Sequence, residues 1–295
     1  MVVLVTGANG QLGQAIQKAS ENNSEITFIF TDSDALDITY KEECENIFNE
    51  LKPDFCINAA AYTAVDKAES EPDLAYRINV TGVKNLAENC KKHNTTLIHI
   101  STDFVFDGEK NSPYTEEGNP NPQSIYGKTK LEGEREIQSV LEKYFIIRTS
   151  WVYSEFGNNF MKTMLRLAKE RSSLNVVNDQ IGTPTNANCL AQAIIEIIKS
   201  EAQSPKPEEK ILNPKSQIQT SDFGLYHFSN EGSCSWYDFA KKIFELNKVK
   251  IELNPIPTSA YPTPAIRPKY SVLDKSKIKK TFGIEIKSWE EALKD

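Results

Sequence analysis

The chain has 295 residues, of which 39% are hydrophobic and 25% charged, and this composition is typical of a water-soluble globular protein with one or two domains. Its net charge of −7 argues against nucleic acid as a partner, because binding to a phosphate backbone requires a concentrated basic surface. The sequence contains no apolar run of about 20 residues and no basic signal-peptide start, so we expect a cytoplasmic protein without a membrane segment.

A glycine-rich turn follows the first apolar run. The short β-branched segment at residues 2–6 predicts a buried strand, and it leads directly into Gly7, Gly10, Gln11, Leu12 and Gly13. Glycines at this spacing permit a tight turn, a close approach of backbone amides to a pyrophosphate, and close packing of a helix on a strand. An ordinary glycine turn is the alternative, but the position at the first strand-to-helix junction favours dinucleotide binding.

The second strand, expected at residues 26–31, is followed by an acidic side chain. Asp32 is suited to accept a hydrogen bond from the adenosine ribose, whereas a 2′-phosphate favours a nearby Arg. Neither Arg nor Lys occurs between residues 26 and 40. The pattern therefore favours NADH over NADPH, with a merely solvated loop charge as the alternative.

Small residues follow the third expected strand, at residues 54–58. Ala59, Ala60 and Ala61, with Tyr62 after them, leave room for a cofactor across the end of the sheet. Tight helix packing is the competing explanation. Helices are expected at residues 40–51 and 72–93. Asn79 lies in the middle of the second helix, where Asn is mildly unfavourable, and this position suggests a functional role.

Hydroxyl groups follow the fourth expected strand, at residues 96–100. Ser101 and Thr102 should lie at the same end of the sheet as the glycine turn, because the strands of such a sheet are parallel. The next expected helix begins near Tyr126, and Tyr126 and Lys130 share one face because residues four apart are neighbours on a helix. We therefore predict a phenol and an ammonium group beside a strand that ends in Thr102.

The Tyr-x-x-x-Lys spacing alone is a weak signal. Tyr237 and Lys241 have the same spacing within Ser-Trp-Tyr-Asp-Phe-Ala-Lys-Lys, and an amphipathic helix can hold such a pair without any catalytic role. Only the pair at residues 126 and 130 follows a strand that ends in hydroxyl side chains. Context therefore favours this pair.

The alternation of strands and helices predicts an α/β fold with a doubly wound, Rossmann-type parallel sheet. Residues 1–150 are interpreted as the NAD(P)-binding domain, and residues 151–295 as mainly a smaller α/β substrate domain, with part of the chain returning to the first. In this second part we expect helices at residues 157–171, 187–199 and 236–247, strands at 174–177 and 224–229, and a loop at 179–185. Residues 200–221 are polar and proline-rich and predict a loop or linker.

Cysteine and histidine spacing gives no sign of a metal site. The cysteines show no Cys-x-x-Cys pair, and we expect free thiols rather than disulfides or a zinc cluster. The three histidines, His93, His99 and His227, are far apart in the sequence and are interpreted as structural or surface residues.

Taken together, the Gly-x-x-Gly-x-x-Gly turn, the segments 58–69 and 101–108, Tyr126-Gly-Lys-Thr-Lys130 and Arg267-Pro268 resemble the dTDP-4-dehydrorhamnose reductase family, in the extended branch of the short-chain dehydrogenases/reductases. The resemblance implies reduction of the C4 ketone of dTDP-4-dehydro-6-deoxy-L-mannose to dTDP-L-rhamnose with NADPH or NADH. It also implies that Tyr126 donates a proton, that Lys130 lowers the pKa of Tyr126 and holds the nicotinamide ribose, and that Thr102 positions the carbonyl.

The same resemblance assigns the remaining residues of the predicted site. Asp37 and Ile38 would lie against the adenine. The sugar would be surrounded by Thr63, Val65, Asp103, Phe104 and Trp151, with a core aromatic as the alternative for Trp151. Arg267 would bind the pyrophosphate of the sugar nucleotide, because a planar guanidinium pairs with two phosphate oxygens; a solvated loop Arg is the alternative.

Related activities differ from this pattern at identifiable positions. A nucleotide-sugar 4,6-dehydratase has Asp-Glu after the Thr, whereas this chain has Asp103-Phe104, so dehydration is disfavoured. A 4-epimerase or another 4-ketoreductase stays possible on the residues alone. So does a non-catalytic NADP-binding subunit that resembles the regulatory β subunit of methionine adenosyltransferase. Ala15 and Asn188 replace the Glu pair that binds Mg²⁺ in some members, so metal-dependent dimerisation is not expected, although a homodimer is left open.

Overall fold

The computed structural model describes residues 1–203 and 222–295, and most of the expected linker at residues 200–221 therefore lies outside the described residues. A six-stranded sheet in the order β10-β5-β4-β3-β1-β2 forms its centre, and every neighbouring pair of these strands is parallel. The six strands are β1 (Val2–Thr6), β2 (Thr27–Thr31), β3 (Phe55–Asn58), β4 (Thr96–Thr102), β5 (Tyr144–Thr149) and β10 (Gly224–His227).

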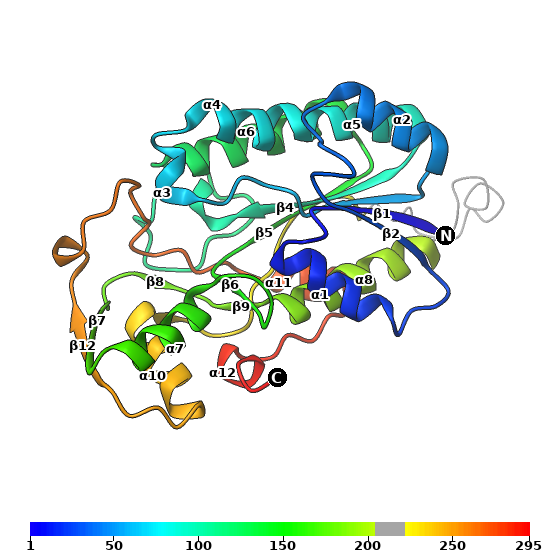
Figure 1. Ribbon diagram of the computed structural model, residues 1–295. Helices are drawn as coiled ribbons and strands as arrows, with labels where there is room; N and C mark the ends of the chain where they lie inside the picture. Colours follow the sequence, from blue (N-terminus) through cyan, green and yellow to red (C-terminus); the bar gives the residue numbers. More distant parts are fainter. Residues whose placement is uncertain (204–221) are drawn as a thin grey trace.

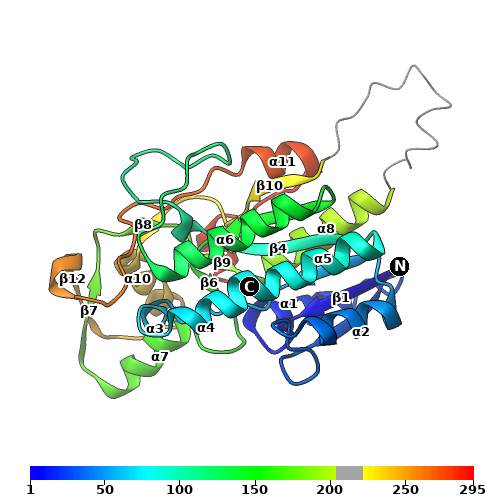
Figure 2. The ribbon, with the colours of Figure 1, turned by 90° about the horizontal axis from the view of Figure 1, so that it is seen from above.

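Helices cover both faces of this sheet, as Figure 1 shows. On one face lie α2 (Lys41–Leu51), α4 (Pro72–Tyr76), α5 (Val83–His93) and α6 (Ile125–Val140). On the other lie α1 (Gln11–Ser20), α8 (Ala187–Gln203) and α11 (Ser276–Phe282). Seen from above in Figure 2, α2, α5 and α6 lie side by side over the strands.

The strand sequences explain this two-sided cover. Side chains alternate between the faces of a strand, and in β1 the side chains of Val3 and Val5 join the core with α1 and α8, while Leu4 joins the core with α2 and α5. All three are fully buried. An almost continuous apolar run is what a strand covered by helices on both faces requires.

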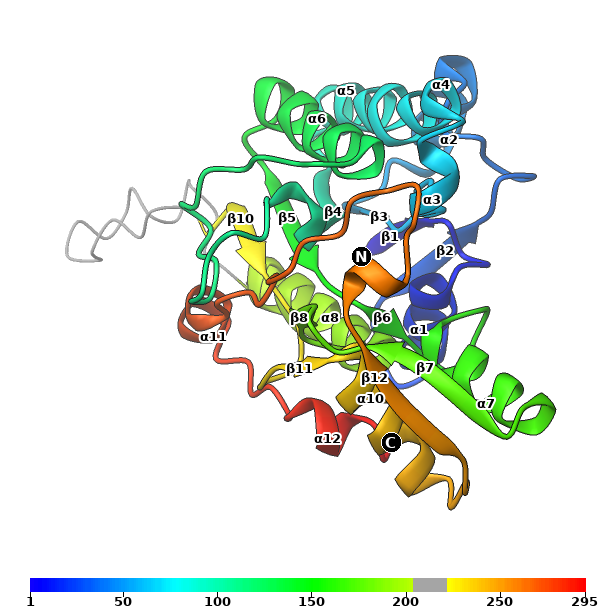
Figure 3. The same cartoon turned by 90° about the vertical axis from the view of Figure 1, so that its left-hand side faces the viewer.

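A smaller lobe lies beside the end of the sheet at which the glycine turn and Thr102 are found, and Figure 3 views it from the left of Figure 1. It contains α7 (Phe160–Glu170), α10 (Trp236–Leu246) and a parallel pair of strands, β7 (Ser173–Val177) and β12 (Glu252–Ile256). Its core includes Met164, Phe239 and Trp289. The remaining short elements are α3 (Val65–Ala68), η1 (Arg77–Gly82), η2 (Asp103–Val105), β6 (Val152–Tyr153), β8 (Ile181–Gly182), β9 (Thr185–Asn186), β11 (Cys234–Ser235), η3 (Thr258–Ala260) and α12 (Trp289–Ala292).

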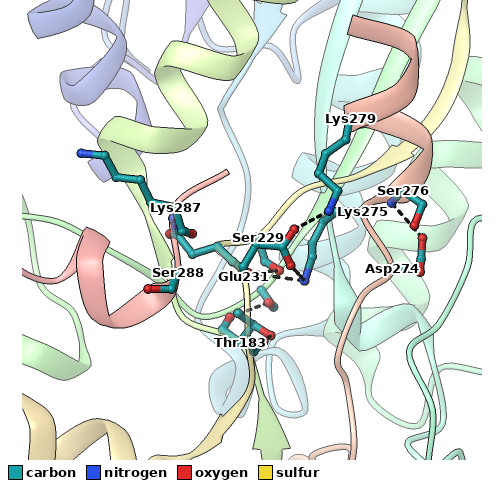
Figure 4. Close-up of polar contacts among 12 residues, drawn as sticks. Thr183, Ser229, Glu231, Asp274, Lys275, Ser276, Lys279, Lys287 and Ser288 are labelled. Carbon is teal, nitrogen blue, oxygen red and sulfur yellow. Dashed lines mark hydrogen bonds and ion pairs between the residues drawn. The ribbon is translucent and has the colours of Figure 1, made fainter. Parts of the chain in front are cut away.

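Charged side chains tie the C-terminal segment to the rest of the molecule (Figure 4). The Glu231 carboxylate binds Lys279 Nζ at 2.7 Å and Lys275 Nζ at 3.4 Å, and both lysines belong to α11 or the residue before it. Thr183 Oγ1 donates to the carbonyl of Gly232 at 2.8 Å. These contacts hold α11 beside β10 and fix the loop that connects the sheet to the smaller lobe.

Two expectations are corrected at the level of secondary structure, and one further strand was not expected. The helix expected at residues 72–93 contains a π-helical segment, η1, around Asn79. The loop expected at residues 179–185 contains β8 and enters β9 at Thr185. Strand β12 contains Pro255. It belongs to a two-stranded sheet in which β7 is its single partner, and such an edge position tolerates proline.

Four of the five cysteines are buried, Cys189 is partly buried, and all five are free thiols. Within residues 1–203 and 222–295, no helix combines the length and apolar character needed to cross a membrane.

Candidate active site

The glycine turn packs so closely on neighbouring backbone that only glycine fits at two of its positions. Gly7 has a φ of +70°, and a Cβ at this position would lie 2.6 Å from the backbone N of Ala60. A Cβ on Gly13 would lie 2.4 Å from the carbonyl oxygen of Gly7. Gly10 precedes α1 without giving it a side-chain cap, so Gln11 and Leu12 begin the helix with their amides towards the turn. The cradle therefore fits the pyrophosphate of a dinucleotide.

Asp32 lies directly after β2, as expected. Its Oδ2 accepts a hydrogen bond from Asn9 Nδ2 at 2.6 Å, and its Oδ1 accepts the Ala35 amide at 3.0 Å. These hydrogen bonds, the one from Ala35 above all, hold the pKa of Asp32 below its ordinary value, so the side chain is a carboxylate. Asp37 follows in the same loop, and Ile38 is buried beside it.

Asn79 holds the segment that contains Ala59, Ala60, Ala61 and Tyr62. Its Oδ1 accepts the Tyr62 amide at 2.9 Å, and its Nδ2 donates to the Tyr62 carbonyl at 3.1 Å. Asn79 is 1% exposed and lies in η1; π-helical segments of this kind are frequent at functional sites. The contacts described for Asn79 are therefore with protein groups, and they support the segment expected to face the cofactor.

Thr102 and Tyr126 meet at the end of the sheet. Thr102 ends β4, Ser124 caps α6 by accepting the Gly127 amide at 3.1 Å, and Tyr126 thus lies in the first turn of that helix. A Cβ on Gly127 would lie 2.2 Å from the carbonyl oxygen of Phe104, so only glycine permits this approach. The Thr102 side chain lies close enough to the Tyr126 phenol to act on its pKa. The Tyr126 ring packs edge-on against Phe104, with the ring centroids 5.5 Å apart.

The expectation that Lys130 lowers the pKa of Tyr126 is wrong for this arrangement. Burial raises the pKa of Tyr126 to about 12, the negative charge of Asp103 adds to this effect, and the nearby Thr102 side chain opposes it. The Lys130 Nζ instead lies 2.6 Å from the carbonyl oxygen of Ile100 and 3.3 Å from His99 Nε2. Lys130 is 2% exposed, and burial lowers its pKa to about 8.

A buried ion pair between Glu134 and Arg148 contacts Ser101 and acts on the pKa of Lys130. Ser101 donates to Glu134 Oε1, and the same carboxylate binds Arg148 through Nε at 2.9 Å and Nη2 at 2.6 Å. Glu134 is one turn beyond Lys130 on α6, and its charge raises the Lys130 pKa against the effect of burial. The hydroxyl of Ser101 therefore has a hydrogen-bond acceptor within the protein, the carboxylate of Glu134.

Asp103 is a buried carboxyl group beside Thr102. Its Oδ1 accepts from Thr102 Oγ1 at 3.1 Å, while no described residue donates to its Oδ2. The side chain is 2% exposed, and burial raises its pKa to about 6, although the nearby Ser271 side chain and the hydrogen bond from Thr102 act in the opposite direction. A buried carboxylate oxygen without a donor is costly, so the position calls for a proton or a bound hydroxyl group.

The other residues expected around the sugar fall into two groups. Thr63 is exposed and Val65 is half-buried at the start of α3, near the Asp66 side chain that binds Arg267. The rings of Trp151 and Trp236 are stacked, with their centroids 3.5 Å apart and an interplanar angle of 9°. Trp151 has a φ of +47°, which is unusual for a non-glycine residue, and it packs against the core of the smaller lobe. The structure therefore gives Trp151 at least one packing role.

A cavity of about 810 Å³ opens between α7, β7, β12 and the segment at residues 256–267. Two arginines, Arg171 and Arg267, contribute to its lining, together with Phe160, Trp236 and Tyr261. Such a mixture of aromatic surface and a few fixed cations is suited to a ligand with a flat ring and negative charge. Arg267, which the sequence predicts to bind a pyrophosphate, therefore belongs to the lining of this cavity.

Sequence patterns did not identify Asn58, His99, Glu134 or Arg148 as neighbours of the site formed by Thr102, Tyr126 and Lys130. His99 was interpreted as structural or surface, and the structure places it against Lys130. Its position three residues before Thr102 in a predicted strand was the only available signal. The described residues contain no group of three or more His, Cys, Asp or Glu side chains arranged to hold a metal ion, and Asn188 hydrogen-bonds with Glu155.

The parallel sheet, the glycine turn after its first strand, and a Tyr and Lys on the helix after a strand that ends in Thr define a Rossmann-type oxidoreductase of the short-chain dehydrogenase/reductase class. The family model of the RmlD substrate binding domain matches residues 1–295, and the chain belongs to this family.

Similar proteins agree with this assignment. A dTDP-4-dehydrorhamnose reductase of Aggregatibacter actinomycetemcomitans is 45% identical over 300 residues, which cover 99% of this chain and 97% of the relative. The crystal structure of such a reductase from Clostridium acetobutylicum has a TM-score of 0.90 and 44% identity, with 100% of this chain and 97% of that chain covered. The one from Bacillus anthracis, solved in complex with NADP, has a TM-score of 0.89 and 41% identity, with 99% and 96% covered.

Proposed function

We propose that the protein reduces the C4 ketone of dTDP-4-dehydro-6-deoxy-L-mannose with NADPH or NADH and so forms dTDP-L-rhamnose, the last step of dTDP-rhamnose synthesis. The observation that carries this proposal is the meeting of Thr102 and Tyr126 at the end of the sheet, in a chain whose full-length relatives are named reductases. A regulatory subunit would not need this centre. The NADP complex of a relative supports NADPH, whereas the lack of basic residues near Asp32 supports NADH.

The chain's own residues supply the proton. A bound nicotinamide cofactor supplies the hydride that reaches C4, and the C4 oxygen then requires a proton. Tyr126 is the donor, because its phenol is protonated at neutral pH in this buried position. Thr102 offers a hydroxyl group that stabilises negative charge on the same oxygen. Lys130, with a pKa of about 8, can return a proton to the phenolate near neutral pH.

The cavity in the smaller lobe is the proposed site of the nucleotide. Arg267 and Arg171 would bind the diphosphate, since guanidinium groups pair with phosphate oxygens through two hydrogen bonds. Phe160, Trp236 or Tyr261 offers a flat surface for the pyrimidine base. In this arrangement residues 151–295 provide most of the substrate domain, while β10 belongs to the central sheet and α8 packs against it. A cytoplasmic location and the lack of a nucleic-acid partner are parts of the same proposal.

Turnover by the purified protein tests the proposal. We expect oxidation of NADPH or NADH that depends on dTDP-4-dehydrorhamnose and yields dTDP-L-rhamnose in equal amount. A matched series of UDP-, GDP- and dTDP-linked ketosugars identifies the nucleotide. Interconversion of C4 epimers without net oxidation of the cofactor would indicate an epimerase instead. No turnover with either cofactor, combined with copurification of a methionine adenosyltransferase, would contradict the enzyme proposal.

A further inference from the structure

A chain of buried hydrogen bonds leads from the glycine-turn side of the sheet to Lys130. Asn58 on β3 and His99 on β4 occupy paired positions of the two strands, and both side chains are completely buried. Asn58 Oδ1 accepts the backbone amide of Ala60 at 3.2 Å and the hydroxyl of Thr6 at 2.8 Å. A backbone amide can only donate, so Asn58 must present its oxygen to Ala60 and its NH₂ group to the other side.

The orientation of Asn58 fixes the tautomer of His99. Asn58 Nδ2 lies 3.0 Å from His99 Nδ1, and an amide nitrogen can only donate here. Nδ1 must therefore accept. A neutral imidazole carries one N–H, which then belongs to Nε2. His99 is neutral, because burial, the largest influence on it, holds its pKa well below the ordinary value.

The Nε2–H of His99 faces the amine of Lys130. Nζ lies 3.3 Å from Nε2 and 2.6 Å from the carbonyl oxygen of Ile100. An ammonium group has three donors and no acceptor. In that form an N–H of Lys130 Nζ would face the N–H of His99 Nε2, and no hydrogen bond could form between them. A neutral amine has a lone pair that accepts this N–H and still donates to Ile100. The geometry of the hydrogen-bond chain therefore favours the neutral form.

The charges around Lys130 act on the same balance between the ammonium and amine forms. On its own helix, Glu134 favours the ammonium form, but both oxygens of this carboxylate bind Arg148 on β5 and one also accepts from Ser101 on β4. Tyr126 in the first turn of the same helix is a neutral phenol, and Asp103 on η2 acts on the pKa of Tyr126. Burial remains the largest influence on Lys130 and lowers its pKa to about 8.

We propose that His99 is a positioning residue that stabilises the neutral amine form of Lys130, by donating Nε2–H to the Nζ lone pair, and so lowers the pH at which Lys130 loses its proton. The inference deepens the proposed reductase mechanism and rests on it for its kinetic consequence only. The ammonium form of Lys130 then requires Nζ to turn away from the Nε2–H of His99. The paired residues Asn58 and His99 thereby set the pH above which the centre loses its cation.

The first test observes His99 in the unaltered protein. The full-length chain is labelled with ¹⁵N at its histidine side chains, and the three histidines are distinguished by single replacement of His93 and His227. We expect the nitrogen shifts and proton couplings of His99 to show a protonated Nε2 and a bare Nδ1 at neutral pH. A protonated Nδ1, or a doubly protonated ring, would overturn the proposal. This readout requires neither substrate nor activity.

The second test follows the titration of Lys130 by ¹³C NMR of labelled lysine Cε groups, with the signal assigned by its loss in Lys130→Met. We expect a midpoint well below the ordinary value of 10.5 in the unaltered protein. In His99→Phe, which keeps a buried flat ring but removes the donor, the midpoint should rise by about one pH unit or more. His227→Phe is the matched control, because His227 is equally buried on β10 and contacts Tyr114 and Phe106 instead. An unchanged midpoint in His99→Phe, or an equal rise in both variants, would refute the role of His99.

The third test applies if the protein is active as proposed. Reductase activity should fall as pH rises through the Lys130 midpoint, because the ammonium form is lost. His99→Phe should move this alkaline limb to higher pH by the same amount as the NMR midpoint, and His227→Phe should not move it. A lower kcat at every pH with an unmoved limb would mean that His99 has only a structural role. If the protein has no reductase activity, the two NMR tests still decide the inference.

Discussion

The guanidinium group of Arg267 binds the carboxylate of Asp66 through two contacts, Nη2 to Oδ2 at 2.6 Å and Nη1 to Oδ1 at 2.9 Å. The pair joins the segment before the C-terminal helices to α3. Val65, which is expected to contact the sugar, is the first residue of α3. Arg267 holds the pKa of Asp66 below its ordinary value, and the Arg267 side chain remains one quarter exposed at the cavity. Asp66 therefore orients Arg267 without burying it.

Replacement of Arg267 by Ala should raise KM for the nucleotide sugar roughly 10- to 100-fold, because a charge-assisted hydrogen bond to phosphate is lost. KM for NADPH should change little. Arg267→Lys should recover only part of the loss, since lysine cannot form the paired contact. Steady-state kinetics with each substrate varied in turn measure both constants.

The matched control for this prediction is Arg166→Ala. Arg166 lies on α7, four other residues of which line the cavity, but its own side chain is exposed and pairs with Glu170. Normal kinetics are expected. An equal rise in KM for the cofactor in Arg267→Ala, or no rise for the sugar nucleotide, would show that Arg267 serves only to bind Asp66.

Removal of the Asn79 side chain should loosen the segment at residues 59–62. Asn79→Ala leaves the amide and carbonyl of Tyr62 without these partners, which should cost about 1–3 kcal/mol of unfolding free energy and weaken cofactor binding by roughly tenfold. Chemical denaturation and fluorescence titration with NADPH measure the two effects. Asn89→Ala is the control: Asn89 is equally buried on α5 but donates only to Asn85 within its own helix. Equal loss of affinity in both variants would contradict the prediction.

The parts of the site that were predictable from sequence depend on local rules. The glycine turn is a short motif whose geometry follows from the missing Cβ atoms, and the structure has that geometry at Gly7 and Gly13. Thr102 and Tyr126 could be placed together because a parallel sheet brings strand ends to one edge. The family resemblance is confirmed over the whole chain.

The parts that were not predictable depend on the register of distant segments. His99 gains its importance from pairing with Asn58 across two strands and from the reach of Lys130 on a helix. Neither relation leaves a pattern in the sequence. The pKa of Tyr126 was misjudged for the same reason: spacing placed Lys130 nearby, whereas burial and the direction of Nζ decide its effect.

Asp103 should make the protein less stable as pH rises through the mildly acidic range. Its pKa is about 6 in the folded state and 3.8 as a reference value, so the folded state binds the proton more tightly than the unfolded chain does. Stability from this group is fully present below pH 3.8 and is lost as pH rises through about 6, by up to about 3 kcal/mol.

Asp103→Asn should remove this dependence, because an amide stays neutral. The unfolding free energy at pH 8 should rise by about 1–3 kcal/mol, with little gain at pH 4. Urea unfolding at both pH values measures the change. Asp107→Asn is the control, since backbone hydrogen bonds, that of Glu109 foremost, hold the Asp107 pKa below its ordinary value, and its replacement should give no gain at pH 8. A loss of stability in Asp103→Asn at pH 8 would refute the assignment.

The two Tyr-x-x-x-Lys pairs provide the sharpest test of the catalytic assignment. Tyr126→Phe removes the proton donor but keeps the ring that packs on Phe104, so turnover should fall roughly 10²- to 10⁴-fold while NADPH binding persists. Tyr237→Phe has the same spacing to Lys241 and lies on α10 of the smaller lobe, away from Thr102 on β4. Its kcat should stay near normal. Equal losses in the two variants would mean that the phenol beside Thr102 is not the donor, because the Thr102 contact is the feature that separates the two tyrosines.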